Sequence, residues 1–436
     1  MSMARKVFVS FLGFNNYGAC HYVRDEFKSS KVRYIQEATV QYLMGQSTWT
    51  KNDAAYILLT EGAEKHNWVD NGQRDRDGNI IEQEGLKSRM NHMDLPFVVH
   101  PIQNLPDGNN EKEIWQIFGR IFEVIEDGDE LYFDLTHGFR YLPMLVLVLG
   151  NYSKFLKNVS IRSITYGNYE SRNKETNEAP IIDLLPLSEL QDWTSSAAAF
   201  LTSGNVTLLK AMCNKKLRPV LMETRGTDIN AQTLQRYMKA LNEVVSDLTT
   251  CRGKNIVSGE HIADMNKYAN KLNEVMIEPM KPIIHKLKDS FEGFMPSEDV
   301  KNGYIAAKWC FQNKLYQQSL TILQETMISH ICEELDWDII EFRKREAVSK
   351  AFRILLYRIV DDKSQWKAEI SDFPLIEKAL ANETLRSLSK YYSTISDIRN
   401  DYNHAGMKSG AASEDSIVSK LEEDLDNIMS LVPKKK

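Results

Sequence analysis

The stretch DELYFDLTHGFRYLPMLVLVLGNY, residues 129–152, indicates how the first part of the chain folds. It begins as a buried strand and ends as an almost entirely apolar helix, with the polar segment DLTHG (134–138) between them. A strand followed directly by a buried helix is a unit of open α/β sheets. Because such a junction needs only a turn, its acid, hydroxyl, imidazole and glycine indicate that a ligand binds there.

Strands and helices alternate on both sides of this stretch. The apolar runs at 6–12, 54–60, 96–102 and 159–167 read as strands, and 113–125 reads as a helix. Trp115, Phe118 and Phe122 have the helical spacing of core residues. A Gly/Asp/Asn-rich segment at roughly 70–92 reads as an exposed insertion. Strands buried on both faces and separated by helices predict a Rossmann-like, mostly parallel sheet.

After about residue 187 the strand signals stop and helical periods continue to the end. The segment 289–303 reads as a hinge between helical units, and 305–335 as a strongly amphipathic helix or helix pair. The sequence therefore predicts an α/β domain at 1–187, a helical linker region at 188–300 and a C-terminal helical domain at 301–436.

Composition limits the classes of function. The 436 residues are 42% hydrophobic and 26% charged, with a net charge of −6, which argues against a general nucleic-acid coat but allows a small phosphate-holding pocket. Five scattered cysteines without a CxxC pair predict reduced thiols and no metal site. The longest apolar run, at 142–149, is too short for a membrane span, and no secretion signal is recognisable. We expect a cytoplasmic protein with no membrane partner.

Three loops follow the carboxyl ends of predicted strands, where ligands bind in open parallel sheets. They offer backbone N–H groups, hydroxyls and glycines that let a backbone approach a ligand closely, which suits a phosphate-bearing ligand. For the last of these loops, the alternative is that Thr136 only caps the next helix and that His137 is only a polar turn residue. The dinucleotide fingerprint GxGxxG is absent, so an NAD site is poorly supported. The candidate residues are Gly13, Phe14, Asn15, Asn16, Thr60, Thr136, His137 and Gly138.

The string DLTHGFRYLP (134–143) resembles the DxTHG signature of CARF domains, the Rossmann-fold sensors of CRISPR-associated proteins. LLTEGAEKHNW (58–68) is similar to a second stretch of the same subfamily, and KVFVSFLG (6–13) resembles its first strand. The resemblance covers about residues 4–187. It implies that two protomers place these loops around a cyclic oligoadenylate, with the loops at 13–16 and 136–138 on the ligand, Thr60 as a weaker contact and Asp134 as a brace.

A second candidate site lies in ISDIRNDYNHAG (395–406). On a helix, Asn400 and His404 share one face, with Arg399 beside them. An imidazole that moves protons and a guanidinium that holds a phosphate could cleave RNA without a metal. The alternative is an exposed helix end at which Gly406 stops the helix and His404 complements its dipole.

This segment resembles the RNxxxH motif of HEPN ribonuclease domains, a recurring partner of CARF domains. The likeness rests on the six-residue motif and the amphipathic helix before it, and it implies that two copies form one composite active site. We therefore expect a cyclic oligoadenylate-activated, metal-independent endoribonuclease that cleaves single-stranded RNA in type III CRISPR antiviral defence. It would act without a cofactor, as a homodimer or higher even-numbered oligomer. The alternatives are a regulator that acts by binding and a ring nuclease that degrades the cyclic oligoadenylate.

Overall fold

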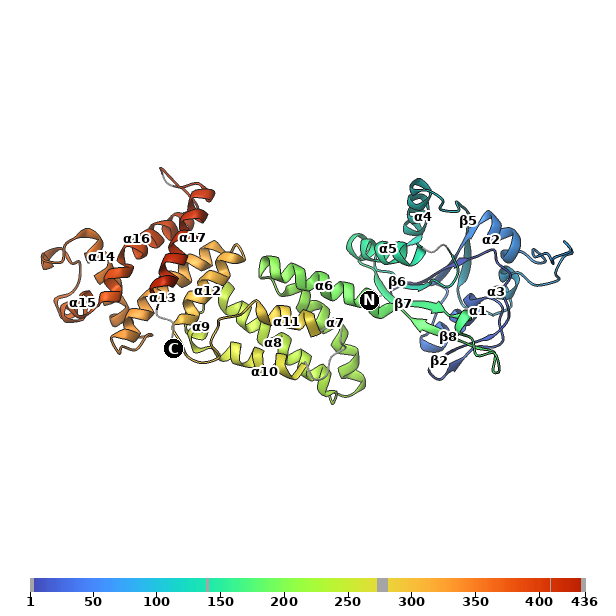
Figure 1. The fold of residues 1–436 in the computed structure, drawn as a ribbon, viewed down its shortest axis with the longest axis horizontal. Coiled ribbons are helices and arrows are strands. Elements are labelled where there is room, and N and C mark those ends of the chain that lie inside the picture. The colour runs from blue at the N-terminus through green and yellow to red at the C-terminus, as the bar shows by residue number, and fades with distance from the viewer. Residues whose placement is uncertain (1–3, 139–140, 273–280, 408, 433–436) are drawn as a thin grey trace. The chain divides into compact units, whose positions relative to one another are not determined.

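The computed structural model describes residues 4–138, 141–272, 281–407 and 409–432. Phe139 and Arg140 of the DLTHGFRYLP string therefore lie outside the described residues. The chain divides into two compact units, Met1–Glu189 and Leu190–Lys436. The first contains the sheet and the second is helical, and each is described by itself (Figure 1).

An eight-stranded sheet in the order β3-β2-β8-β7-β6-β1-β4-β5 forms the centre of the first unit (Figure 1). The pairs β2–β3 and β7–β8 are antiparallel and all other pairs are parallel, which confirms the mostly parallel sheet. Sequence patterns did not indicate β2, β3 or β8, which are short and carry polar residues. The strands are β1 (Lys6–Leu12), β2 (His21–Arg24), β3 (Phe27–Lys28), β4 (Ala54–Thr60), β5 (Val98–Leu105), β6 (Glu130–Asp134), β7 (Ser160–Gly167) and β8 (Glu178–Asp183).

Helices cover both faces of this sheet. Alternate side chains of β1 point to opposite faces. Phe11 and its neighbours of the same parity pack with α4 and α5, whereas Phe8 and Leu12 pack with α1 and α3. The fold is therefore a three-layer helix–sheet–helix arrangement. The helices of this unit are α1 (Ile35–Gln46), α2 (Glu61–Ala63), the π-helical turn η1 (Glu64–Trp68), α3 (Leu86–Asn91), α4 (Glu111–Val124), α5 (Leu142–Lys157) and the 3₁₀ turn η2 (Tyr169–Ser171).

The register of the sheet brings the predicted loops together. β1 lies between β4 and β6, with Leu12 opposite Leu59 and Ser10 opposite Asp134. Because the three strands are parallel, the loops that follow them leave from the same edge of the sheet. This edge holds the first candidate site.

Two expectations for this unit were wrong. The insertion at 70–92 is not uniformly exposed, because Gln73, Leu86 and Met90 are buried. Trp115 is 60% exposed, although Phe118 packs partly against the core as expected. The helical spacing identified the apolar face of α4, but it could not show that the part of this face at Trp115 is exposed to solvent.

The second unit is entirely helical among the described residues. One hydrophobic cluster runs through it from Trp193 to Ile428. The amphipathic segment 305–335 falls on a pair of helices, α12 and α13. No described helix is long and apolar enough to cross a lipid bilayer. The helices are α6 (Leu185–Ser203, which begins in the first unit), α7 (Thr207–Glu223), α8 (Ile229–Thr249), α9 (Gly253–Ser258), α10 (Glu260–Leu272), α11 (Lys281–Asp289), α12 (Lys301–Gln312), α13 (Tyr316–Glu334), α14 (Phe342–Tyr357), η4 (Lys363–Gln365), η5 (Ile370–Asp372), α15 (Phe373–Leu380), α16 (Glu383–Asn403) and α17 (Glu414–Leu431).

Candidate functional site

A cavity of about 180 Å³ lies at the carboxyl ends of β1, β4 and β6. All of the residues proposed for the first site line it except Asn16, whose side-chain oxygen instead accepts a hydrogen bond from Arg33 at 3.3 Å. Thr60 also caps α2, since its hydroxyl accepts a hydrogen bond from the Ala63 N–H. The lining residues are Phe11, Leu12, Gly13, Phe14, Asn15, Tyr17, Leu58, Thr60, Leu105, Pro106, Ile117, Thr136, His137 and Gly138.

The hydroxyl of Thr136 connects two strands. It donates to Asp134 Oδ1 at 2.5 Å and accepts from the Gly167 N–H at 2.7 Å. The residue at the N-cap of α5 is Tyr141, so Thr136 does not cap that helix. Thr136 thus fixes the turn after β6 against the end of β7. A ligand that contacted the Thr136 hydroxyl would have to leave these two hydrogen bonds in place or replace one of them.

Asp134 is fully buried beneath this turn. Its second oxygen accepts a hydrogen bond from Ser10 at 2.7 Å, so the carboxyl joins β6 to β1 as well as to Thr136. Burial raises the pKa of Asp134 to about 6, against the opposing effect of the hydrogen bonds from Thr136 and Ser10. Asp134 does not line the cavity and acts as a brace.

His137 faces the cavity and stacks on Tyr17, which the sequence patterns did not identify as a site residue. The two ring centroids are 4.0 Å apart and the ring planes are inclined by 20°. Burial lowers the pKa of His137 to about 4, so the imidazole is neutral near pH 7. Its Nε2 is buried and has no hydrogen-bond partner among the described residues. A neutral imidazole provides one donor and one acceptor, and a ligand could satisfy the unpartnered nitrogen.

Two glycines make close approach possible at this cavity. A Cβ at position 13 would collide with the hydroxyl of Tyr17. Gly138 has φ of +145°, which L side chains rarely adopt, and a Cβ there would collide with Leu142. A side chain at position 13 would therefore displace Tyr17 from the cavity wall, and one at position 138 would collide with α5.

Two amide side chains hold the loop that follows β1, and the sequence patterns missed both as site residues. Asn67 Nδ2 donates to the carbonyl oxygens of Gly13 at 2.9 Å and Asn15 at 2.8 Å. Gln73 Nε2 donates to the carbonyl of Phe14 at 3.3 Å and to Asn67 Oδ1 at 3.1 Å. We call Asn67 and Gln73 the loop clamp. It occupies the carbonyl oxygens of the loop, and the backbone of Gly13 and Asn15 also hydrogen-bonds to the hydroxyl of Tyr17.

The second candidate site lies at the end of α16. Asn400 and His404 are exposed, and His404 is the residue at the C-cap of the helix. Arg399 is half-buried, and its Nε has no hydrogen-bond partner among the described residues. At about 100° per residue, Asn400 and His404 lie about 40° apart around the helix, whereas Arg399 and His404 lie about 140° apart. The shared face of Asn400 and His404 matches the expectation, but Arg399 points elsewhere on the same helix.

Asp401 determines the conformation of the chain after the motif. Its buried carboxylate accepts a hydrogen bond from the Ala412 N–H at 3.0 Å, and its carbonyl accepts one from the Gly406 N–H at 3.0 Å. Gly406 and Ala412 are thereby both bonded to α16. The motif letters alone did not indicate this role of Asp401.

Comparison with known proteins places the first unit in context. Residues 7–170 match the family model described as CRISPR system endoribonuclease Csx1, CARF domain. The chain is also similar to the CRISPR-associated protein MJ1674 of Methanocaldococcus jannaschii, with 26% identity over 229 residues. That similarity covers 52% of this chain and 33% of the relative, so the chain spans about a third of the length of the curated protein it matches. Together these findings support a CRISPR-associated protein with a CARF-type ligand-sensing domain.

Proposed function

We propose that this protein is a cyclic oligoadenylate-activated, metal-independent endoribonuclease that cleaves single-stranded RNA in type III CRISPR antiviral defence. The observation that most supports this proposal is the cavity at the sheet edge, where a neutral His137 with an unpartnered nitrogen lies beside the clamped loop at 13–15. The similarity of residues 7–170 to a CARF domain supports the ligand class. Arg399, Asn400 and His404 are the proposed catalytic residues.

The size of the cavity supports a ligand shared between two protomers. At about 180 Å³ it is smaller than the pockets that enclose a drug-sized ligand, which start at roughly 300 Å³. One cavity therefore holds a part of a nucleotide, and the rest of a cyclic oligonucleotide must lie outside it. Two cavities related by a two-fold axis would hold opposite sides of such a ring.

In the proposed reaction, His404 accepts the proton of a ribose 2′-hydroxyl, and the 2′-oxygen attacks the adjacent phosphorus. The bond from phosphorus to the 5′-oxygen breaks, and that oxygen takes up a proton from an imidazolium, that of His404 or of its counterpart in the second copy. The products are a 2′,3′-cyclic phosphate and a 5′-hydroxyl. Arg399 stabilises the charge on the phosphoryl oxygens, and Asn400 orients the strand. Because Arg399 and His404 diverge around α16, a site that combines residues of two copies is favoured.

The surface of α5 supports a second copy as the partner. Leu145 and Leu149 are buried on one side of the helix, whereas Val148 and Phe155 are 52% and 83% exposed on the other. A helix that is apolar on all sides is usually buried in the functional assembly. A symmetric dimer would cover this face with the same face of the partner. The exposed apolar residues of α5 are Met144, Val148, Tyr152, Phe155 and Leu156.

The test is an RNA cleavage assay with chelator present. Labelled single-stranded RNA is incubated with the protein and EDTA, with and without a panel of cyclic oligoadenylates of different ring size. We expect one ring size to stimulate cleavage and the products to end in a 2′,3′-cyclic phosphate. Cleavage that no cyclic oligoadenylate stimulates, or that requires a metal, would contradict the proposal.

A further inference from the structure

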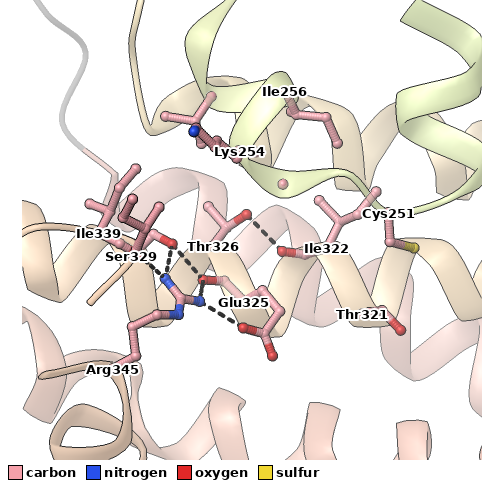
Figure 2. Close-up of a pocket in the computed structure, with 14 residues that line it drawn as sticks. Cys251, Lys254, Ile256, Thr321, Ile322, Glu325, Thr326, Ser329, Ile339 and Arg345 are labelled. Carbon is pink, nitrogen blue, oxygen red and sulfur yellow. Dashed lines mark hydrogen bonds and ion pairs between the residues drawn. The ribbon is translucent and has the colours of Figure 1, made fainter. Parts of the chain in front are cut away.

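The helical unit contains a second cavity, of about 340 Å³, between α9, α13 and the segment that leads into α14. Figure 2 shows Lys254 and Ile256 of α9 on one side, with Thr326, Glu325 and Arg345 on the other. Its volume lies in the range of small-ligand sites. The apolar walls are formed by Ile256, Val257, Ile322, Ile339 and Ile340.

Arg345 is fixed in place at the polar end of this cavity (Figure 2). One terminal nitrogen donates to Ser329 Oγ at 2.8 Å and to the Ile339 carbonyl at 2.7 Å. The other donates to Glu325 Oε2 at 2.6 Å. A guanidinium with these bonds holds the Glu325 carboxylate in one orientation. The polar end is thus preorganised.

Two charged groups at this cavity are available to a ligand. Glu325 Oε1 accepts no hydrogen bond from the described residues, whereas Oε2 accepts one from Arg345, and the side chain is 47% exposed. The exposed ammonium of Lys254 makes no ion pair within the described residues. The cavity therefore combines apolar walls, one fixed acceptor and one cation. A ligand that matches it has an apolar surface, a hydrogen-bond donor and an attached anion.

We infer that this cavity binds one nucleotide of the RNA strand that is cleaved. The base would lie between the isoleucine side chains, its amino group would donate to Glu325 Oε1, and a phosphate would pair with Lys254. This inference rests on the proposed ribonuclease function and adds a base-recognition subsite to it.

The position of α13 connects the cavity to the candidate catalytic residues. Gln317 on α13 donates to the side-chain oxygen of Asn403, in the segment that contains Asn400 and His404, at 3.1 Å. Thr321 and Glu325 follow Gln317 at four-residue intervals on α13, and both line the cavity. At 1.5 Å per residue, Glu325 lies about 12 Å along the helix from Gln317. An RNA strand that followed α13 would therefore extend from the candidate catalytic residues to the cavity.

A fixed carboxylate acceptor favours bases with an exocyclic amino group, which are adenine, cytosine and guanine, over uracil. The first test measures the rate of cleavage of RNAs that differ only at one base near the scissile bond. We expect the wild type to prefer an amino-bearing base, on the order of tenfold, as for a hydrogen bond to a charged group. Glu325→Gln should reduce this preference, because an amide can also donate to uracil.

Two further variants sharpen this test. Lys254→Met should raise the RNA concentration needed for half-maximal rate while leaving the base preference in place. Glu346→Gln is the matched control, since Glu346 pairs with Lys350 on α14 and does not line the cavity. An unchanged base preference in Glu325→Gln would overturn the inference.

A second test does not depend on cleavage. Cys251 lines the cavity and is half-buried, whereas the other four cysteines are buried, so thiol-alkylation kinetics report on the cavity. In the His404→Ala variant we expect single-stranded RNA to slow alkylation of Cys251. If RNA does not protect Cys251 from alkylation, or if only mononucleotides protect it, the cavity is not a subsite for the RNA substrate. If the wild type cleaves RNA under none of the conditions while RNA still protects Cys251, the ribonuclease proposal fails instead.

Discussion

The imidazole of His137 lies flat against the phenol ring of Tyr17, with their centroids 4.0 Å apart. The stack closes one side of the cavity at the sheet edge and buries the imidazole. Burial favours the neutral form, which explains why the pKa of His137 falls to about 4. The candidate ligand site is therefore built around an uncharged histidine, which offers a ligand hydrogen bonding rather than a charge.

This relationship predicts a pH-dependent stability. Folding lowers the pKa of His137 from 6.5 to about 4, so the unfolded chain binds the proton more tightly and acid favours unfolding between these values. The stability that depends on neutral His137 is complete above pH 6.5 and is lost as the pH falls toward 4. Between pH 7 and pH 5 the loss should be about 2 kcal/mol.

Urea unfolding of the wild type and His137→Gln at both pH values measures this effect. The variant should gain about 2 kcal/mol relative to the wild type at pH 5. Asp134 changes stability in the opposite direction, because folding raises its pKa to about 6, but this contribution is common to both proteins and cancels in the difference. A difference that does not change with pH would mean that His137 is not buried in its neutral form.

The catalytic proposal predicts that His404→Ala and Arg399→Ala each abolish RNA cleavage. Loss of a general acid–base group costs roughly 10²–10⁴ in rate. Asn400→Ala should have a smaller effect, since an amide orients the strand but transfers no proton. His404 is exposed, so its truncation leaves no core cavity and should keep the thermal midpoint. Full activity of His404→Ala, measured with labelled RNA, would place the active site elsewhere.

If ligand binding at the first site regulates cleavage at the second, substitutions at the two sites should abolish different properties. His137→Ala or Thr136→Ala should remove the stimulation of cleavage by cyclic oligoadenylate and keep the slow cleavage seen without ligand. His404→Ala should instead retain ligand affinity, as measured by calorimetry. Unchanged stimulation of His137→Ala by every ring size would show that the cavity is not the sensing site.

Removing a residue of the loop clamp should weaken ligand binding, although neither clamp residue lines the cavity. Asn67→Ala removes the hydrogen bonds to the carbonyls of Gly13 and Asn15 and should cost about 1–3 kcal/mol of stability. Because the loop at 13–15 is then released, calorimetry should also show weaker binding of cyclic oligoadenylate. Gln41→Ala, which removes contacts to Ser30 outside the cavity, is the control and should bind the ligand as the wild type does. Equal affinity of Asn67→Ala and the wild type would show that the clamp is dispensable.

The apolar face of α5 predicts that charge introduced there dissociates a dimer. Val148→Lys and Phe155→Lys place an ammonium on the exposed side, where burial by a partner would be unfavourable. Light scattering should show a monomer for each variant and a dimer for the wild type. Gln46→Lys, at the exposed end of α1, should remain dimeric. Dimers of both α5 variants would show that another surface joins the copies.

Apolar patterns predicted the parts of the fold with strong periodicity. β1 and β4 are mostly apolar runs, β6 has an apolar centre and β7 alternates apolar and polar residues, and the predicted parallel arrangement was enough to predict that the loops after β1, β4 and β6 meet. β3 has only two residues, and so short a segment gives no periodic signal. The three added strands at the sheet edge therefore emerged only from the structure.

The sequence predicted those residues of the candidate site whose side-chain or backbone chemistry is characteristic. It did not predict the residues that only hold the backbone in place. His137 and Gly138 stand out in a short polar segment. Asn67 and Gln73 bind carbonyl oxygens, and an amide with that role has no characteristic neighbours in sequence. Tyr17 was missed because its contact with His137 joins two loops that are distant in the chain.

The hydrogen bonds of Thr136 have a consequence for how such domains are compared. Of the DxTHG letters, Asp134 and Thr136 are bonded to each other and to neighbouring strands, and Gly138 supplies an unusual backbone angle. Only His137 presents an unpartnered polar atom to the cavity. The signature thus identifies a shape of the polypeptide and says little about which molecule is recognised. Two proteins could share all of its letters and still bind different ligands, through differences in the other residues that line the cavity, such as those of the loop at 13–15.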